Sequence, residues 1–398
     1  MAARRAVIID AVRSPFAKGR PDGALAGLHP VDLYAQILRA LVARTDVDPA
    51  LIEDVITGCV LQVGEQAGNI GRQAALAAGF PESVPAVTLD RKCGSAQQAI
   101  DFAAQGVIAG AYDVVIAGGV EMMSLVPMRS NRQGKDSEGP LFRARYPNGL
   151  PHQGASAEMI AARWGLSREA LDAYALRSHR LAAEAEDKGI TARSVIPVDI
   201  RRGDDVAAVK RDEGLRRDTN MDKLAALKPA FRTDALASAN PDLGWVVTAG
   251  NSSQVTDGAS AALIVEEKTA ARLGLAPRAA AVAFAVAADD PVLNLTAPMP
   301  ATRKLLARAD LSIEEVDCFE VNEAFASVVL AYAKELQIDV NKINQLGGAI
   351  ALGHPVGASG GRLLCALLDT LATSQGRYGL LTMCESGGMA NATLIERF

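Results

Sequence analysis

The chain contains few of the residues that build disulfide or metal scaffolds. It has 398 residues but only five cysteines and four histidines, and aromatic residues make up 4%. The cysteines are odd in number, widely spaced and without a Cys-x-x-Cys pair, which argues against a disulfide framework and a zinc site. We therefore expect no metal and no permanently bound cofactor. The five positions are Cys59, Cys93, Cys318, Cys365 and Cys384.

Long apolar runs and an excess of basic residues are also missing. No stretch approaches the ~18 apolar residues of a membrane-spanning helix. The apolar run after the basic residues 1–5 stops at Asp10, which is too short for a secretion signal, and the last three residues, 396–398, match no known targeting signal. The net charge is −5, so nothing global attracts nucleic acid or a membrane surface. We expect a cytoplasmic protein without membrane or nucleic-acid partners.

Core-forming residues are plentiful, and their pattern repeats along the chain. Hydrophobic residues make up 49% of the sequence, enough for two similar units and an insertion. Each copy has an apolar strand, a helix ending in an acidic turn, a second strand, and a later strand rich in small residues. Alternating strands and helices predict parallel sheets covered by helices, in a duplicated α/β domain with a pseudo-twofold axis. The matching segments are 6–10 with 281–288, 41–56 with 305–317, and 113–119 with 379–384.

Composition changes between the two copies, where charged runs alternate with a helix expected over residues 167–187. Ser167 and Ala170 fit the N-cap and first turn of that helix. We interpret this stretch as an inserted loop domain and place the boundaries as follows: 1–124 and 249–274 form the first half, 125–248 the insertion, and 275–398 the second half. The insertion is also the most basic part of the chain, and a solvated surface of mixed charge is the simpler explanation for most of its basic residues. These residues are Arg211, Arg216, Arg217, Lys223, Lys228 and Arg232.

Two residues stand in settings that favour chemistry. Cys93 follows an apolar segment and precedes a small, helix-compatible run, so its sulfur is expected at a helix N-terminus, where a thiolate is favoured. His354 lies between glycines, which let the backbone approach closely, and this setting favours a general base. His179 is expected to be solvated on a charged helix, and His29 to begin a helix or turn. The remaining cysteines, apart from Cys384, are expected to be buried apolar residues.

Four motifs together resemble the thiolase family, the acyl-CoA:acetyl-CoA C-acyltransferases. The resemblance covers essentially the whole chain, and although each motif alone is weak, their order and spacing are highly specific. It implies the thiolase fold, with two α/β halves in five αβαβα layers and an inserted loop domain. The motifs are Cys93-Gly94-Ser95, Asn322-Glu323-Ala324-Phe325, Gly353-His354-Pro355-Val356-Gly357-Ala358-Ser359-Gly360, and Cys384 followed by Ser386-Gly387-Gly388-Met389.

The resemblance implies a role for each matching residue. Cys93 is the nucleophile that takes the acyl group, and His354 is the base that activates it. Cys384 moves a proton on or off the acetyl C2 and later takes the proton of incoming CoA. Asn322, with His354 and a water, stabilises the enolate oxygen. The backbone N–H groups of Cys93 and Ser386 form a second oxyanion hole for the acyl-enzyme.

The same resemblance makes the insertion a binding site for coenzyme A, the co-substrate. The phosphates of CoA give the basic residues of the insertion a possible use. The residues implied to bind CoA or the acyl group are His152, Gln153, Arg217, Lys228, Ala249, Ser253 and Phe325.

Several residues depart from the family pattern. Asp90 and Ala96 flank the nucleophile where Asn and Gly are common. Ser386 and Ala390 replace frequent glycines, and Ser386 is tolerated unless its backbone needs a positive φ. Gln153 and Asn294 stand where acetoacetyl-specific relatives carry Met, so four-carbon specificity is in doubt and a longer, branched or cyclic acyl chain becomes plausible. The other departures have no assigned effect.

The leading hypothesis is thiolytic cleavage of 3-oxoacyl-CoA by CoA, giving acetyl-CoA and a shortened acyl-CoA through acyl-Cys93 in acyl degradation. A biosynthetic acetoacetyl-CoA thiolase is the first alternative. A decarboxylating ketoacyl synthase is disfavoured because such enzymes carry His or Asn at the position of Cys384. A catalytically weakened acyl-CoA or sterol-carrier binder is disfavoured by the four retained catalytic residues. The resemblance also implies a homodimer or homotetramer.

Overall fold

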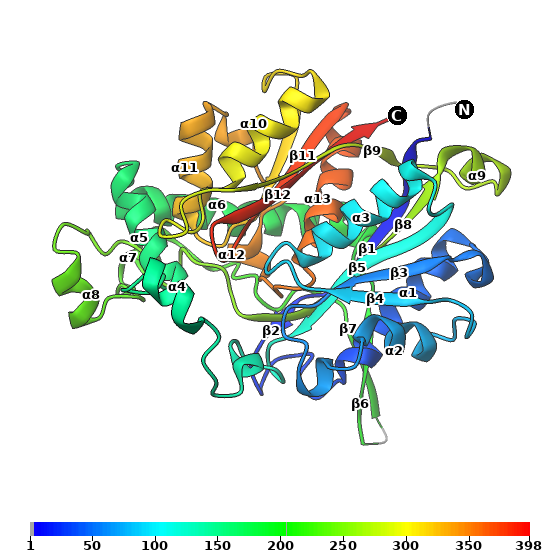
Figure 1. The fold of residues 1–398 in the computed structure, drawn as a ribbon, viewed down its shortest axis with the longest axis horizontal. Helices are drawn as coiled ribbons and strands as arrows, with labels where there is room; N and C mark the ends of the chain where they lie inside the picture. Colours follow the sequence, from blue (N-terminus) through cyan, green and yellow to red (C-terminus); the bar gives the residue numbers. More distant parts are fainter. Residues whose placement is uncertain (1–3, 204) are drawn as a thin grey trace.

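The computed structural model describes residues 4–203 and 205–398 as a five-layered α/β protein (Figure 1). The N-terminal segment before Arg4, part of the stretch examined for a signal, lies outside the described residues. Within the described part of the chain, no helix is long and apolar enough to cross a membrane. Nor does that part contain a cluster of three His, Cys, Asp or Glu side chains suited to holding a metal ion.

Ten strands form one continuous sheet, to which each half of the chain contributes a block. The first half supplies β1 (Ala6–Arg13), β2 (Ala17–Lys18), β3 (Asp54–Gly58), β4 (Ala86–Leu89), β5 (Val114–Met122) and β8 (Thr256–Glu266). The second half supplies β9 (Ala279–Ala288), β10 (Cys318–Val321), β11 (Tyr378–Glu385) and β12 (Met389–Arg397). The strand order is β10-β11-β12-β9-β1-β8-β5-β3-β4, with β2 paired to β8.

The two blocks are related in the way the internal repeat predicts. The order β9-β12-β11-β10 on one side mirrors β1-β8-β5-β3 on the other, and the halves meet where β1 pairs with β9 in antiparallel fashion. This junction is short, running from the pair Ala6 and Ala281 to the pair Ile8 and Ala279. The equivalent loops of the two halves therefore face each other across the junction.

The expectation of wholly parallel sheets is wrong for one strand in each block. β3, β4 and β5 are parallel, as are β10 and β11, but β8 runs antiparallel to both of its neighbours in the main order and so does β12. The reason is visible at β12, which follows β11 after only a three-residue turn. A connection this short can join only antiparallel strands, because a parallel strand needs a crossover.

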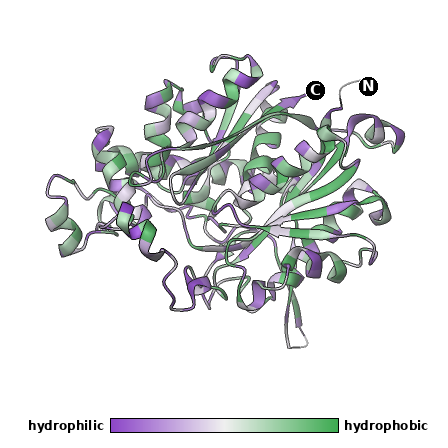
Figure 2. Ribbon diagram, in the orientation of Figure 1, coloured by the Kyte–Doolittle hydropathy of each residue, from purple (hydrophilic) through white to green (hydrophobic). Residues whose placement is uncertain are grey.

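Helices form the other three layers. α3 (Ser95–Ala109) and α13 (Ser359–Ser374) pack against each other between the two blocks of the sheet. Both are buried over most of their length. The outer layers are formed on one side by α1 (Pro30–Thr45) and α2 (Ile70–Ala77), and on the other by α10 (Pro298–Ala309) and α11 (Ala326–Leu336). Figure 2 shows the apolar strands at the centre of these layers.

The segment between β5 and β8 forms a lobe whose residues 139–163 and 221–239 extend to the left in Figure 1, while its two hairpin strands, residues 198–202 and 205–209, project at the bottom. Ser167 caps α6 by accepting a hydrogen bond from Ala170 N–H at 3.2 Å, as the sequence predicts. The proposed boundaries at 124/125 and 248/249 stay a prediction. The elements of this lobe are α4 (Gly139–Arg145), α5 (Gln153–Arg163), α6 (Arg168–Asp187), β6 (Val198–Arg202), β7 (Asp205–Val209), α7 (Met221–Ala225) and α8 (Asp234–Ala239).

Short elements complete the chain. They are α9 (Glu267–Arg272), α12 (Ala349–Leu352), and single 3-10 turns at Pro49–Leu51, Gly64–Gln66, Ser130–Arg132, Ile190–Arg193 and Val340–Lys342. α12 leads directly into the glycine-rich motif around His354, which ends at the start of α13.

Candidate active site

Cys93 lies in a tight turn between β4 and α3. Lys92 adopts a left-handed φ of 49°. The turn is closed by Ser95, whose Oγ accepts from Arg91 N–H at 2.9 Å and donates to the Lys92 carbonyl at 2.6 Å. Asp90 adds an acceptor for Lys92 N–H at 2.6 Å, so Asp at this position supports the turn. Cys93 is thus fixed just before the N-terminus of a buried helix, with 8% of its surface exposed.

His354 is held on every side. Gly353 has a φ of 104°, and a Cβ there would overlap Thr256, so this position requires glycine. The backbone N–H of His354 donates to the Gln254 carbonyl at 3.0 Å and to Thr256 Oγ1 at 3.1 Å. Its Nδ1 lies 2.6 Å from Ser359 Oγ at the start of α13. The ring is therefore oriented by Ser359 at the start of α13, and the backbone of His354 is fixed by residues at and just before the start of β8.

The other ring nitrogen of His354 faces Asn322. The distance from His354 Nε2 to Asn322 Nδ2 is 3.3 Å. Asn322 follows β10 and is fully buried, and its own N–H donates to the Thr382 carbonyl at 3.1 Å on β11. Two predicted site residues, 32 positions apart, are thereby brought into contact.

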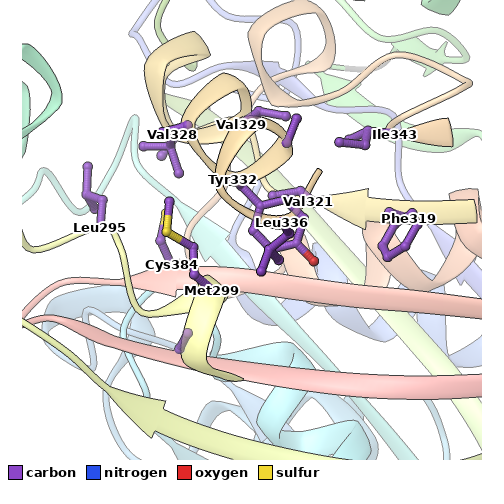
Figure 3. Packing of buried hydrophobic residues seen from close by; sticks show 14 of the residues in the cluster. Leu295, Met299, Phe319, Val321, Val328, Val329, Tyr332, Leu336, Ile343 and Cys384 are labelled. Carbon is purple, nitrogen blue, oxygen red and sulfur yellow. The ribbon is translucent and has the colours of Figure 1, made fainter. Parts of the chain in front are cut away.

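Cys384 lies near the end of β11, where its side chain joins an apolar cluster with Leu295 and Met299 (Figure 3). The turn that follows has positive φ angles at Gly387 and Gly388, 96° and 76°, but not at Ser386. The serine therefore causes no backbone strain.

Asn294 is a residue whose role sequence reasoning missed. Its Oδ1 accepts from Gly387 N–H at 2.6 Å and from Gly388 N–H at 3.2 Å. The side chain is buried and adopts a φ of 63°, which Asn tolerates better than most residues. Its polar atoms thus hold the turn after Cys384. Its side-chain oxygen is therefore used by the turn, and the argument from Asn294 for a changed acyl specificity has no support in this arrangement.

The expected lowering of the Cys93 pKa is wrong for this resting structure. Burial raises the pKa of Cys93 to about 12, and the nearby Glu385 carboxylate adds to the effect. The pKa of Cys384 is raised too, by burial first and then by the charge that Cys93 would carry. The turn and helix N-terminus that predicted a thiolate are present, but desolvation outweighs them. Both cysteines therefore rest as neutral thiols.

The pKa of His354 is shifted in the opposite direction, downward. Burial, with a smaller contribution from the positive charge of Arg362, lowers the pKa of His354 to about 3. The imidazole is therefore neutral at physiological pH and has a nitrogen free to accept a proton. A neutral thiol and a neutral imidazole are the protonation states from which general-base activation starts.

Three aromatic rings lie in contact at the lobe side of the site. The His152 ring stacks on Phe231 at 5.5 Å between centroids, and Phe231 meets the edge of Phe325 at 5.7 Å. His152 also caps α5 by accepting from Gly154 N–H at 3.1 Å, which places Gln153 at the first position of that helix. Phe325 is the last residue of the Asn322 motif, so these rings connect the insertion to the predicted catalytic residues.

The remaining predicted binding residues differ in their surroundings. Ser253 N–H donates to the Ala324 carbonyl at 2.9 Å, which fixes the segment containing Ala249 beside the Asn322 motif. Arg217 is already paired with Glu186 and with Asp187, the latter at 2.9 Å. Lys228 is exposed and has no ion pair among residues 4–203 and 205–398.

His179 corrects a further expectation. It was expected to be solvated, but it is 2% exposed and its Nδ1 accepts from Arg216 N–H at 3.2 Å. Burial lowers its pKa to about 4. Of its charged neighbours in sequence, Arg180 is exposed, whereas Arg177 is half-buried and donates to the Val340 carbonyl at 2.9 Å. His29 caps α1 through Val31 N–H at 3.3 Å, as expected. The noncatalytic cysteines, Cys59, Cys318 and Cys365, are buried as expected.

The two halves of a duplicated α/β fold thus carry two buried thiols and a neutral imidazole, a set of groups suited to acyl transfer. Residues 6–268 match the thiolase N-terminal domain and residues 275–397 match the thiolase C-terminal domain. The chain therefore belongs to the thiolase family, and it is an acyltransferase.

Individual relatives agree with this assignment. The chain is 45% identical to the steroid 3-ketoacyl-CoA thiolase FadA6 of Mycobacterium tuberculosis, over 98% of this chain and 94% of that protein. It is 41% identical to a beta-ketoadipyl-CoA thiolase of Escherichia coli, over 99% and 100% of the two chains. The crystal structure of the Bacillus anthracis acetyl-CoA acetyltransferase superimposes with a TM-score of 0.89 at 37% identity, covering both chains completely. The expected thiolase fold is thereby confirmed.

Proposed function

We propose that this enzyme cleaves 3-oxoacyl-CoA with CoA through an acyl group carried on Cys93, in acyl-chain degradation. The observation that carries this proposal is the environment of His354, which is neutral, fixed through Nδ1 by Ser359 and in contact through Nε2 with Asn322. The relatives named 3-ketoacyl-CoA thiolases support the degradative reaction, and the biosynthetic alternative is not favoured.

In the first half-reaction, the Cys93 thiol gives its proton to His354 as its sulfur bonds to the 3-oxo carbon of the substrate. The bond between C2 and C3 then breaks, and the electron pair leaves on the acetyl-CoA enolate. Asn322 Nδ2 donates to the enolate oxygen, while the Cys384 thiol gives its proton to C2. Cys384 is left as a thiolate and His354 as an imidazolium.

In the second half-reaction, the Cys384 thiolate takes the proton of incoming CoA. The CoA sulfur attacks the thioester on Cys93, which leaves as a thiolate and regains its proton from His354. Cys93 and Cys384 are then both neutral thiols again, and His354 is a neutral imidazole. The N–H groups of Cys93 and Ser386 stabilise the oxyanion of this step, and each such donor typically contributes ~10²–10³ in rate. The fixed turn at Asn294 keeps the Ser386 donor in place.

The stacked rings of His152, Phe231 and Phe325 form one wall of the path along which the pantetheine arm of CoA reaches Cys93. Ser253 and Ala249 lie on the segment that borders this path. Lys228 is free to meet a CoA phosphate, whereas Arg217 must first give up its carboxylate partners, so Lys228 is the stronger candidate of the two.

The acyl group that this enzyme accepts is larger than the four-carbon acetoacetyl unit. Gln153, at the start of α5 beside His152, replaces the Met of acetoacetyl-specific relatives. The relatives named for steroid and beta-ketoadipyl substrates also act on acyl groups larger than acetoacetyl. The protein works in the cytoplasm as a homodimer or homotetramer, the state that closed symmetry favours.

The test is a CoA-dependent cleavage assay with acetoacetyl-CoA and with longer, branched and ring-bearing 3-oxoacyl-CoAs. The kcat/KM is expected to be higher on the larger substrates, and a preference for acetoacetyl-CoA contradicts the substrate assignment. Incubation without CoA, followed by peptide mass mapping, should place the acyl group on Cys93. An adduct on Cys384 would reverse the roles of the two thiols. Cys93→Ser is the control for both measurements.

A further inference from the structure

Glu385 is a buried carboxyl that the reaction above does not use. It follows Cys384 at the end of β11 and has no exposed surface. Neither of its oxygens has a hydrogen-bond partner within the two described segments of the chain. A buried carboxyl without hydrogen bonds is costly to keep, so its place beside a catalytic cysteine calls for a reason.

The side chain of Glu385 crosses from the second half of the protein to the nucleophile turn of the first. A Cβ on Gly94 would lie 2.9 Å from Glu385 Cδ and even closer to its Oε1, so the carboxyl occupies the space beside this glycine. Asn391 on β12 borders the same space and donates through Nδ2 to the Gly94 carbonyl at 3.1 Å. Glu385 and Asn391 together confine the residue that follows Cys93.

Charged groups face Glu385 from each neighbouring element. The nucleophile turn contributes Asp90 and Arg91, and α3 contributes Asp101. Arg91 favours the carboxylate form and the two acids oppose it, but burial is the largest effect and raises the pKa of Glu385 to about 8. Lys92 and Cys93 on the same turn, and Cys384 on the same strand, complete the titratable groups around this position.

We propose that Glu385 is a positioning residue that sets the charge beside the nucleophile turn: its neutral form permits the Cys93 thiolate to develop, and its carboxylate form opposes it. The inference rests on the proposed role of Cys93 as nucleophile. In the neutral state the carboxyl supports Gly94 by packing alone. When it loses its proton, a negative charge enters a site with little solvent, directly behind the residue after Cys93.

The size of the effect of Glu385 on the Cys93 pKa follows from the burial of both side chains. Like charges a few ångströms apart repel much more strongly in a desolvated site than in water. A change of one unit in the Cys93 pKa alters the thiolate fraction about tenfold. Asp90 carries the same charge on the same turn, but its side chain is 28% exposed and paired with Lys92, so solvent and the ammonium group reduce its influence.

The experiment compares wild type with Glu385→Gln, which keeps shape and removes the charge. Iodoacetamide labelling of Cys93 is followed by peptide mass mapping from pH 6 to pH 10. We expect similar rates at pH 6, where Glu385 is neutral, and roughly tenfold faster labelling of the variant at pH 9 or above. Asp90→Asn is the matched control and should change the rate less than about twofold at every pH.

Three outcomes overturn the proposal: a rate ratio that does not vary with pH, slower labelling of Glu385→Gln at high pH, or equal effects of the two variants. A second measurement covers the case in which Glu385→Gln fails to fold. In that case Glu385→Ala, which also removes the charge, is labelled in the same way: its rate relative to wild type should rise as the pH rises through about 8, and a ratio that does not vary with pH contradicts the inference. Labelling needs no substrate, so it is independent of the assay that tests the thiolase reaction.

Discussion

Ser359 Oγ lies 2.6 Å from Nδ1 of His354, and the same hydroxyl donates to the Pro355 carbonyl at 2.9 Å. Because the hydroxyl proton is given to that carbonyl, the oxygen is left to accept from Nδ1–H. This fixes the tautomer in which Nε2 is the free base, facing Asn322. The glycine-rich motif therefore supplies both the proposed base and the residue that orients it.

Ser359→Ala should lower kcat by about 10- to 100-fold with little change in KM, because the imidazole loses its orientation but substrate contacts remain. Steady-state kinetics on a 3-oxoacyl-CoA measures this. Ser194→Ala is the control, since it removes a buried hydroxyl bonded to Asp369 that contacts none of the catalytic residues. An unchanged kcat in Ser359→Ala would show that the ring is held by other contacts.

Asn294→Ala should impair both stability and rate. It removes the acceptor for two glycine N–H groups, at a cost of about 1–3 kcal/mol, and places Ala at a φ of 63°. Asn294→Asp keeps the acceptor and should retain most activity, while Asn294→Gly keeps the backbone freedom and loses the acceptor. Denaturant unfolding and kcat would be measured for all three. If Asn294→Gly behaves like wild type, the hydrogen bonds to the turn are not what matters.

The proposed proton transfers at Cys384 and His354 are separable. Cys384→Ala should nearly abolish exchange of the acetyl C2 protons, by a factor of ~10²–10⁴, while Cys93 remains alkylatable. His354→Ala should slow the alkylation itself, because the base that takes the Cys93 proton is gone. Proton exchange is followed by NMR and alkylation by mass spectrometry. Wild-type alkylation rates in both variants would mean that the activating base lies elsewhere.

Two buried groups give the stability a predictable pH dependence. The pKa of His354 falls from 6.5 to about 3 on folding, so the unfolded chain binds more protons between these values and stability is lost as the pH falls below 6.5. The pKa of Glu385 rises from 4.5 to about 8, so the folded chain binds more protons there and stability is lost as the pH rises through that window. The Tm of Glu385→Gln minus that of wild type should therefore increase by a few degrees between pH 5 and pH 9. A constant difference contradicts the raised pKa.

The sequence predicted the duplicated fold because that fold depends on local patterns, and the roles of the site residues, which rest on short motifs, stay a prediction. The repeated strand and helix segments, the Ser167 cap and the glycines around His354 are all short-range signals. The direction of each strand was harder to predict from the sequence, because only the brief turn before Met389 indicates that β12 runs antiparallel to β11. The burial of individual polar side chains was harder still to predict. His179 and Glu385 are residue types that usually face solvent, and the residues that bury them come from segments distant in sequence. An acidic residue ending the apolar run 379–384 was the one signal that pointed to Glu385.

The raised thiol pKa values illustrate a limit of motif reasoning. A turn leading into a helix N-terminus favours a thiolate only when solvent or a nearby cation helps to carry the charge. Here Cys93 is surrounded by apolar residues and by the Glu385 carboxyl. The depth at which Cys93 is buried depends on the packing of α3 against α13, which cannot be inferred from any single segment of the sequence.

The short pairing of β1 with β9 has a consequence for the order of events during folding. Each block of the sheet closes largely through neighbours from its own half, whereas Cys93 of the first block comes near Cys384 of the second only after the two blocks have docked. Contacts between residues so far apart in the chain form slowly. In refolding, helical signal should therefore recover first, and enzymatic turnover should return only with the docking of the halves.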